Sequence, residues 1–365
     1  MGYKIPIYEP SLSGNEKKYV NECLDSSWIS SRGEFINKFE QEFIHYIGSK
    51  HAVSVSNGTV ALHLALVTLG ISDGDEVIVP SFTYIASVST ICHAGATPVF
   101  VDSIYKTWQV DPDQVRKAIT PKTRAIMVVH LYGQPCEMDE LVKIAKENNI
   151  FIIEDCAEAF GSLYKGKKVG TFGDIACFSF YGNKTITTGE GGMVVTNDET
   201  LWDRAYHLRM HGLAKYREYW HDVLGFNYRM TNICAAIGLA QLEQAEEKIR
   251  AKRELAHNYM DLLKNVPIEF NKEAPDTFHT YWMISILVEN RNIREKLREQ
   301  LKSDSIETRP TFYPVHTMPM FSHKYQKLPV AEDIGWRGIN LPSFPTLTRN
   351  QLEQITESIK KFFKG

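Results

Sequence analysis

The sequence has no long apolar run and no surplus of either charge. No stretch approaches the ~20 consecutive apolar residues that a membrane-spanning helix needs, and the net charge is only −3. Such a balance gives no general attraction for nucleic acid or for an anionic membrane. The first residues also lack the apolar segment of a secretory signal peptide. We therefore expect a cytoplasmic protein with neither nucleic acid nor a membrane as its partner.

Cysteine pairs and metal-binding motifs are absent too. The six cysteines are scattered and form no Cys-x-x-Cys pair, which argues against structural zinc and against a disulfide framework. His207 and His211 stand four residues apart, but the intervening residues lack the glutamate of a zinc protease site. We interpret these histidines as packing residues and expect no metal.

What the chain does have is a regular alternation of apolar runs and helical patterns in its first half. The runs are rich in Val, Ile and Phe, and several lack polar alternation, which is typical of strands buried on both faces. Helical patterns such as 60–69 and 139–148 separate them. The sequence therefore predicts an α/β fold with a mainly parallel seven-stranded sheet and helices on both faces, with strands near 51–54, 76–79, 98–101, 125–129, 150–154, 176–180 and 193–196.

The pattern changes after Asn232. Residues 233–263 have apolar positions at helical spacing, which predicts one long helix or two abutting helices. A strand near 282–288 and helices near 293–301 and 349–363 follow. With 365 residues, about two domains are expected. We place a large domain at 1–245 and a smaller α+β domain at 246–365.

Distinctive polar residues follow the predicted strands, where open α/β sheets bind ligands. Lys184 comes shortly after one strand and before the glycine-rich segment 189–192. A partly desolvated lysine can form a Schiff base, although a lone loop lysine is usually a solvated surface residue. Asp155 ends another strand. It is suited to a protonated pyridine nitrogen such as that of pyridoxal phosphate, or to capping a helix.

Two further groups stand at strand ends. Asn57, Gly58 and Thr59 precede a predicted helix, whose N-terminus favours a phosphate; a plain capping turn would look the same. The hydroxyl of Ser179 could add a donor. Tyr84 is an aromatic residue placed either to stack on a flat ring or to pack in the core.

Together these segments resemble the sugar-nucleotide aminotransferases of the DegT/DnrJ/StrS family. The resemblance runs from about Ile7 to the C-terminus, and the order, spacing and residue types all agree. It implies the architecture of a fold-type I enzyme dependent on pyridoxal phosphate. The segments that carry it are Asn57-Gly58-Thr59-Val60-Ala61-Leu62, Pro80-Ser81-Phe82-Thr83-Tyr84, Glu154-Asp155-Cys156-Ala157-Glu158-Ala159, Phe178-Ser179-Phe180 with Lys184, and Gly189-Glu190-Gly191-Gly192.

The resemblance also implies roles for single residues. Lys184 would form the Schiff base with the cofactor and shuttle protons, and Asp155 would pair with the pyridinium nitrogen. Gly58, Thr59 and Ser179 would hold the phosphate with Asn57 close by, and Tyr84 would stack on the ring. Asn227 would reach the cofactor phosphate of a neighbouring subunit, which implies a homodimer with shared active sites and leaves pairing into a tetramer open. The segments that match the sugar-nucleotide pocket are Ser27, Trp28, Ile29 and Ser30, and Tyr313, Pro314, Val315 and His316.

Some positions depart from the usual family pattern. Glu158 stands near the cofactor's ring oxygen, where the family often has Gln, and a carboxylate there must be protonated or paired. Asn183 and Gly182 replace the usual Ser or Thr and Pro. With these residues the chain is most similar to the perosamine synthases, which use GDP-4-keto-6-deoxymannose and glutamate. This similarity implies a role in O-antigen or other polysaccharide biosynthesis.

Four alternatives remain open. The same family acts on UDP- and dTDP-linked keto sugars. Its dehydratase branch replaces the Schiff-base lysine with histidine, and Lys184 argues against that branch. A nucleotide-dependent dehydrogenase would need a G-x-G-x-x-G motif after an early strand, where the chain has only Asn57-Gly58-Thr59. A regulator that binds a sugar nucleotide without catalysis would not need both Lys184 and Asp155.

Overall fold

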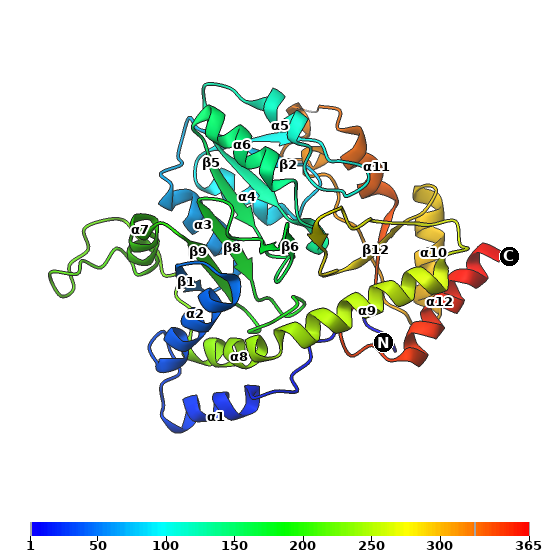
Figure 1. The fold of residues 1–365 in the computed structure, drawn as a ribbon, viewed down its shortest axis with the longest axis horizontal. Coiled ribbons are helices and arrows are strands. Elements are labelled where there is room, and N and C mark those ends of the chain that lie inside the picture. The colour runs from blue at the N-terminus through cyan, green and yellow to red at the C-terminus, as the bar shows by residue number, and fades with distance from the viewer. Residues whose placement is uncertain (1, 325, 365) are drawn as a thin grey trace.

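The computed structural model describes residues 2–324 and 326–364, and its centre is a seven-stranded sheet (Figure 1). The strand order is β1-β9-β8-β5-β4-β2-β3, and only β9 runs antiparallel to its neighbours. Each predicted apolar run forms one of these strands, so the predicted fold class is confirmed. The strands are β1 (His51–Val55), β2 (Glu76–Pro80), β3 (Thr97–Val101), β4 (Thr123–Val129), β5 (Phe151–Asp155), β8 (Ile175–Ser179) and β9 (Gly192–Thr196).

Apolar side chains on both faces of the sheet explain why helices cover both. Successive residues of a strand point to opposite faces: Val77 and Val79 of β2 join one core cluster, and Ile78 joins another. The first face packs on α3 (Gly58–Thr68), α4 (Ile85–His93) and α7 (Glu199–Arg209). The second packs on α1 (Glu16–Asp25), α2 (Glu34–Ile47), α5 (Pro112–Ala118), α6 (Met138–Asn148) and α8 (Asn232–Glu243).

The C-terminal part builds a second, smaller core. Its antiparallel sheet has the order β10-β12-β14-β13, and α9 (Ala245–Leu263) crosses from the large sheet to this part (Figure 1). The elements are β10 (Glu269–Phe270), β12 (Ile284–Leu287), α10 (Arg291–Ser303), β13 (Arg309–Pro310), α11 (Pro329–Arg337), β14 (Gly338–Leu341) and α12 (Arg349–Lys364), with short 3-10 turns at Val315–Thr317 and Ser322–Lys324. A further 3-10 turn, Leu131–Gly133, follows β4 of the large sheet. A minor sheet joins β6 (Leu163–Tyr164), β7 (Lys167–Lys168) and β11 (Thr277–Phe278).

Helix α9 belongs to both cores. Ile249 packs in the cluster that covers the large sheet, whereas Leu255 and Tyr259 pack in the C-terminal cluster. Ile5, at the other end of the sequence, also packs in the C-terminal cluster and bridges to Ile306. The division at 245/246 therefore stays a prediction, and the N-terminal segment lies against the smaller core. In the part of the chain that the structure describes, no helix combines the length and the apolar character needed to cross a membrane.

Candidate active site

A cavity of about 680 Å³ lies at the carboxyl ends of the central strands. Strands β1, β2, β5 and β8 run in the same direction, so their carboxyl ends meet at one edge of the sheet, where ligands bind in open α/β folds. The cavity brings together most of the residues that the sequence selects for the cofactor. Those that line it are Asn57, Gly58, Thr59, Tyr84, Asp155, Glu158, Ser179 and Lys184.

One end of the cavity is shaped for an anion. Asn57 precedes α3 and accepts the N–H of Val60 at 3.0 Å, so the capping role and a place at the cavity coexist. The first-turn N–H groups of a helix lack intrahelical acceptors and favour negative charge. Gly58 lies against Ser179: a Cβ atom at Gly58 would be 2.6 Å from the Ser179 Cβ. Only glycine lets the start of α3 and the end of β8 approach this closely.

Asp155 is buried at the inner wall. The hydroxyl of Ser87, from α4, donates to Oδ2 at 2.7 Å, and the N–H of Ala157 donates to Oδ1 at 3.1 Å. Burial raises the pKa of Asp155 and outweighs the opposite effects of the Ser87 bond and the Lys184 charge. A buried carboxylate of this kind is stabilised by a cationic partner, which a protonated ring nitrogen supplies.

Lys184 and Glu158 face each other in the cavity. The Nζ of Lys184 lies 3.8 Å from Oε1 of Glu158 and 3.9 Å from the centroid of the Trp282 ring. Burial lowers the pKa of Lys184, while the charges of Glu158 and Asp155 act in the opposite direction. A lower pKa leaves more of the amine neutral, and the neutral amine is the nucleophile.

Glu158 can meet either of the two conditions that its position sets, protonation or pairing. Burial raises its pKa to about 7, so near neutral pH a large share of the carboxyl groups carry a proton. Its Oε2 atom also accepts the N–H of Tyr132 at 2.9 Å. The group can therefore stand near an electron-rich oxygen either as a neutral acid or paired with Lys184.

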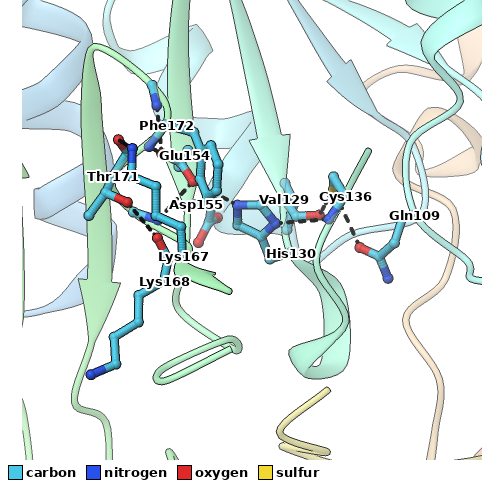
Figure 2. A network of polar contacts seen from close by, with 12 residues as sticks. Gln109, Val129, His130, Cys136, Glu154, Asp155, Lys167, Lys168, Thr171 and Phe172 are labelled. Atoms are coloured by element: carbon cyan, nitrogen blue, oxygen red, sulfur yellow. Dashed lines mark hydrogen bonds and ion pairs between the residues drawn. The ribbon is translucent and has the colours of Figure 1, made fainter. Parts of the chain in front are cut away.

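A buried hydrogen-bond network around His130 and Glu154 holds the end of β5 (Figure 2), and the sequence analysis did not predict it. His130 Nδ1 accepts the N–H of Cys136 at 3.1 Å, so its Nε2 carries the proton that it donates to Glu154 at 3.0 Å. Burial alone would raise the pKa of Glu154, but the His130 bond and backbone N–H groups hold it below its ordinary value. Gly170, Phe172 and Gly173 supply these N–H groups, at 2.7–2.8 Å.

His130 and Glu154 also lie near Cys156, close enough for three such groups to hold a metal ion. Because both oxygens of Glu154 accept hydrogen bonds, we interpret the group as a support for Asp155, the next residue. The signal in the sequence was the acidic pair at the end of a buried strand, with a histidine at the end of the strand beside it.

The other expected residues lie outside the cavity of the single chain. Asn227 is exposed, and Trp28 and Ile29, of the segment Ser27–Ser30, are about half exposed. Val315 and His316 are buried, and Nδ1 of His316 lies 2.6 Å from the Ser81 hydroxyl. Lining residues that the sequence analysis did not select include Ser87, Trp282, Arg309, Phe312 and Asn340.

Comparison with known proteins agrees with this arrangement. The model of the DegT/DnrJ/EryC1/StrS aminotransferase family matches residues 10–360. The chain belongs to this family. A GDP-perosamine synthase from Escherichia coli O157:H7 is 64% identical over 98% of both chains, and one from Vibrio cholerae is 50% identical over 98% of this chain and 99% of the relative. The solved structure of S. venezuelae DesV has a TM-score of 0.91 at 36% identity and covers 96% of this chain and 95% of that one.

Membership of the aminotransferase family and the cavity lead to the same chemistry. The chain is an enzyme, a sugar aminotransferase that depends on pyridoxal phosphate. Its residues fit that cofactor: the anion-binding end suits the phosphate, Asp155 suits the ring nitrogen, and Lys184 supplies an amine in the same cavity. When bound, the cofactor supplies an electron sink for the carbon that loses its proton.

Proposed function

We propose that this enzyme transfers the amino group of glutamate to the C4 ketone of GDP-4-keto-6-deoxy-D-mannose and so forms GDP-perosamine for O-antigen or other polysaccharide synthesis. The observation that carries this choice of substrate is the 64% identity, over nearly the whole of both chains, to a protein named GDP-perosamine synthase. The second relative with that name, at 50% identity, supports it. The six free cysteines support a reducing compartment, and we propose the cytoplasm.

Each residue of the cavity has a proposed task. Lys184 would hold the cofactor at rest. Its amine would then move a proton at the α-carbon of glutamate in one half-reaction and at C4 of the sugar in the other. Asp155 would keep the ring nitrogen protonated, and Gly58, Thr59 and Ser179 would bind the phosphate with Asn57 close by. Tyr84, about half exposed at the cavity, would cover the ring.

The substrate proposal predicts a ranking of nucleotide sugars. GDP-4-keto-6-deoxymannose should give a higher kcat/KM than UDP- or dTDP-linked keto sugars, because the chain is 64% and 50% identical to two proteins named GDP-perosamine synthase. The measurement is 2-oxoglutarate released from glutamate with each sugar in turn. A higher kcat/KM for a UDP- or dTDP-linked sugar would overturn the choice of substrate and leave the aminotransferase assignment standing.

We also propose a homodimer with shared active sites. A loop after α7 stands off from the body of the chain (Figure 1). It exposes large apolar side chains: Tyr216 is 73% exposed, Tyr219 94% and Leu224 97%. Exposed apolar groups in one segment favour an interface. Asn227 follows this loop and lies outside its own cavity, so it is available to the cofactor phosphate of a second copy.

The shared site predicts recovery of activity in mixed dimers. Lys184→Ala and Asn227→Asp should each inactivate the enzyme, the second by placing a negative charge beside the phosphate. In a mixed dimer one active site has both substitutions, Lys184→Ala from its own chain and Asn227→Asp from the partner chain. The other active site has neither substitution. Random exchange makes about half of the dimers mixed, so about a quarter of all sites should recover in a two-fold pair. The measurement is activity after co-expression of the two variants.

The control mixes Lys184→Ala with Asp155→Ala. Both side chains line the cavity of their own chain, so every site of that mixed dimer keeps one lesion and no recovery is expected. If the Lys184 and Asn227 variants also show none, with mixed dimers confirmed by mass, the shared-site proposal fails.

A further inference from the structure

Trp282 lies just before β12 and places its ring against the amine of Lys184. The Nζ atom is 3.9 Å from the ring centroid, and Trp282 is only 5% exposed. An ammonium at this distance over the face of an indole is attracted by the ring quadrupole, most strongly where water is excluded. The C-terminal part of the chain thus supplies the aromatic face that the Lys184 amine meets.

Hydrogen bonds fix this ring in place. The backbone N–H of Trp282 donates to the Tyr132 carbonyl at 2.9 Å, and its Nε1 donates to the Asn183 carbonyl at 2.7 Å. The buried Nζ of Lys252 donates to the Trp282 carbonyl at 3.0 Å. The indole also stacks on the Tyr132 ring, with centroids 6.0 Å apart and an angle of 11° between the planes. Contacts on several sides leave the indole little freedom.

Tyr132 connects the two groups that face the amine. Its carbonyl accepts from Trp282, and its N–H donates to Glu158. Tyr132 is fully buried and has φ = 57°, a left-handed conformation that costs free energy in a residue with a side chain. In this conformation a single residue fixes both Trp282 and Glu158.

Burial makes a charged Lys184 costly in free energy. Glu158 compensates this charge only in part, because with a pKa of about 7 a large share of its carboxyl groups are neutral near neutral pH. The aromatic face attracts the ammonium at any pH. Among the other charged or titratable groups around Lys184, Asp155 acts on the amine through its charge, and the hydroxyl of Tyr8 donates to the Lys184 carbonyl. The same cavity is also lined by Tyr84, Tyr181, Glu190 and Arg309. Lys252 lies on the backbone side of Trp282.

We propose that Trp282 is a positioning residue for Lys184: its ring face holds the ammonium whenever the amine is free and keeps the proton-carrying nitrogen beside Glu158. The proposal rests on the role of Lys184 proposed above. Trp282 itself moves no proton. Its effect is on where the Lys184 nitrogen lies and on how strongly that nitrogen holds its proton.

The first test is the pH dependence of Lys184 labelling in the full chain freed of cofactor. An amine-reactive reagent labels the neutral amine, and peptide mass analysis reads the label at Lys184. Trp282→Leu should move the labelling midpoint to lower pH by roughly half to one and a half units, because the ammonium loses the aromatic face. Trp282→Phe keeps a ring and should move it less. An unchanged or higher midpoint in Trp282→Leu would overturn the proposal.

Trp202→Leu is the matched control. Trp202 is also largely covered and also donates its Nε1 to a carbonyl, that of Ala52, at 3.2 Å, but it belongs to α7 and stacks on His51 of β1, outside the cavity. The Trp202→Leu variant should leave the pH midpoint of Lys184 labelling unchanged. Thermal unfolding of each variant shows whether the fold is retained.

The second test is the glutamate half-reaction of the loaded enzyme. Trp282→Leu should lower its maximal rate about tenfold with little change in the glutamate concentration at half-maximum, and Trp282→Phe should recover most of that loss. A role confined to the Nε1 bond with Asn183 would leave Trp282→Phe as slow as Trp282→Leu, which would overturn the proposal. If the unaltered enzyme shows no glutamate reaction, the proposed function fails, while the labelling test of Trp282 still stands.

Discussion

Replacing Lys184 by alanine should remove measurable turnover of glutamate and keto sugar while leaving the fold intact. The substitution deletes the amine that lies between Glu158 and Trp282. In the proposed mechanism that amine holds the cofactor and moves a proton in both half-reactions, and a positioned acid–base group alone contributes ~10²–10⁴-fold. The measurement is 2-oxoglutarate formation, together with the visible absorption of the lysine-bound cofactor, which should also disappear.

Lys165→Ala is a suitable control for this variant. Lys165 is an exposed lysine that pairs with Asp139 on the surface, and surface ion pairs contribute little to stability. It should retain both the rate and the absorption band. A folded Lys184→Ala protein with the unaltered rate would falsify the assignment of Lys184.

Replacing Asp155 by alanine should leave the cofactor bound through its phosphate but slow the glutamate half-reaction by ~10²–10³-fold, the range typical of lost electrostatic stabilisation. Asp155 is buried and held by Ser87 and Ala157, so its carboxylate is fixed where a ring nitrogen needs a negative partner. Without it the ring nitrogen loses its proton and absorbs less charge. Single-turnover kinetics with glutamate measure the effect.

Asp198→Ala separates this role from helix capping, the other interpretation of an aspartate at a strand end. Asp198 caps α7 by accepting the N–H groups of Thr200 and Leu201 at 2.7 and 3.0 Å. Its loss should cost about 1 kcal/mol of stability and leave the single-turnover rate unchanged. An unchanged rate in Asp155→Ala as well would count against the ring-nitrogen assignment.

The sequence predicted the large sheet well because burial on both faces leaves a direct record in the composition of each strand. It also selected most of the lining residues of the cavity, for a related reason. Asn57, Asp155 and Ser179 each stand at the carboxyl end of a strand or just beyond it, and parallel strands bring those ends together. Position along the chain was therefore enough to predict that they meet.

Other parts of the site depend on packing that no local pattern records. Trp282 comes from the C-terminal part, and hydrogen bonds with Tyr132, Asn183 and Lys252 hold it beside Lys184. Tyr132 adopts a left-handed conformation that its residue type does not favour. Arg309 and Phe312 line the cavity next to a predicted segment, Tyr313–His316, whose last three residues are buried. Which residues near this segment line the cavity depends on packing, which spacing along the chain does not record.

The most direct test of the account is to locate the cofactor on the chain. The holoenzyme is reduced with borohydride, digested and examined by peptide mass. We predict a pyridoxyl group on the peptide that contains Lys184, and its loss when glutamate is added before reduction, because the donor then frees the lysine. A pyridoxyl group on another lysine, or labelling of Lys184 that glutamate leaves unchanged, would contradict the central claim that this amine carries the transfer.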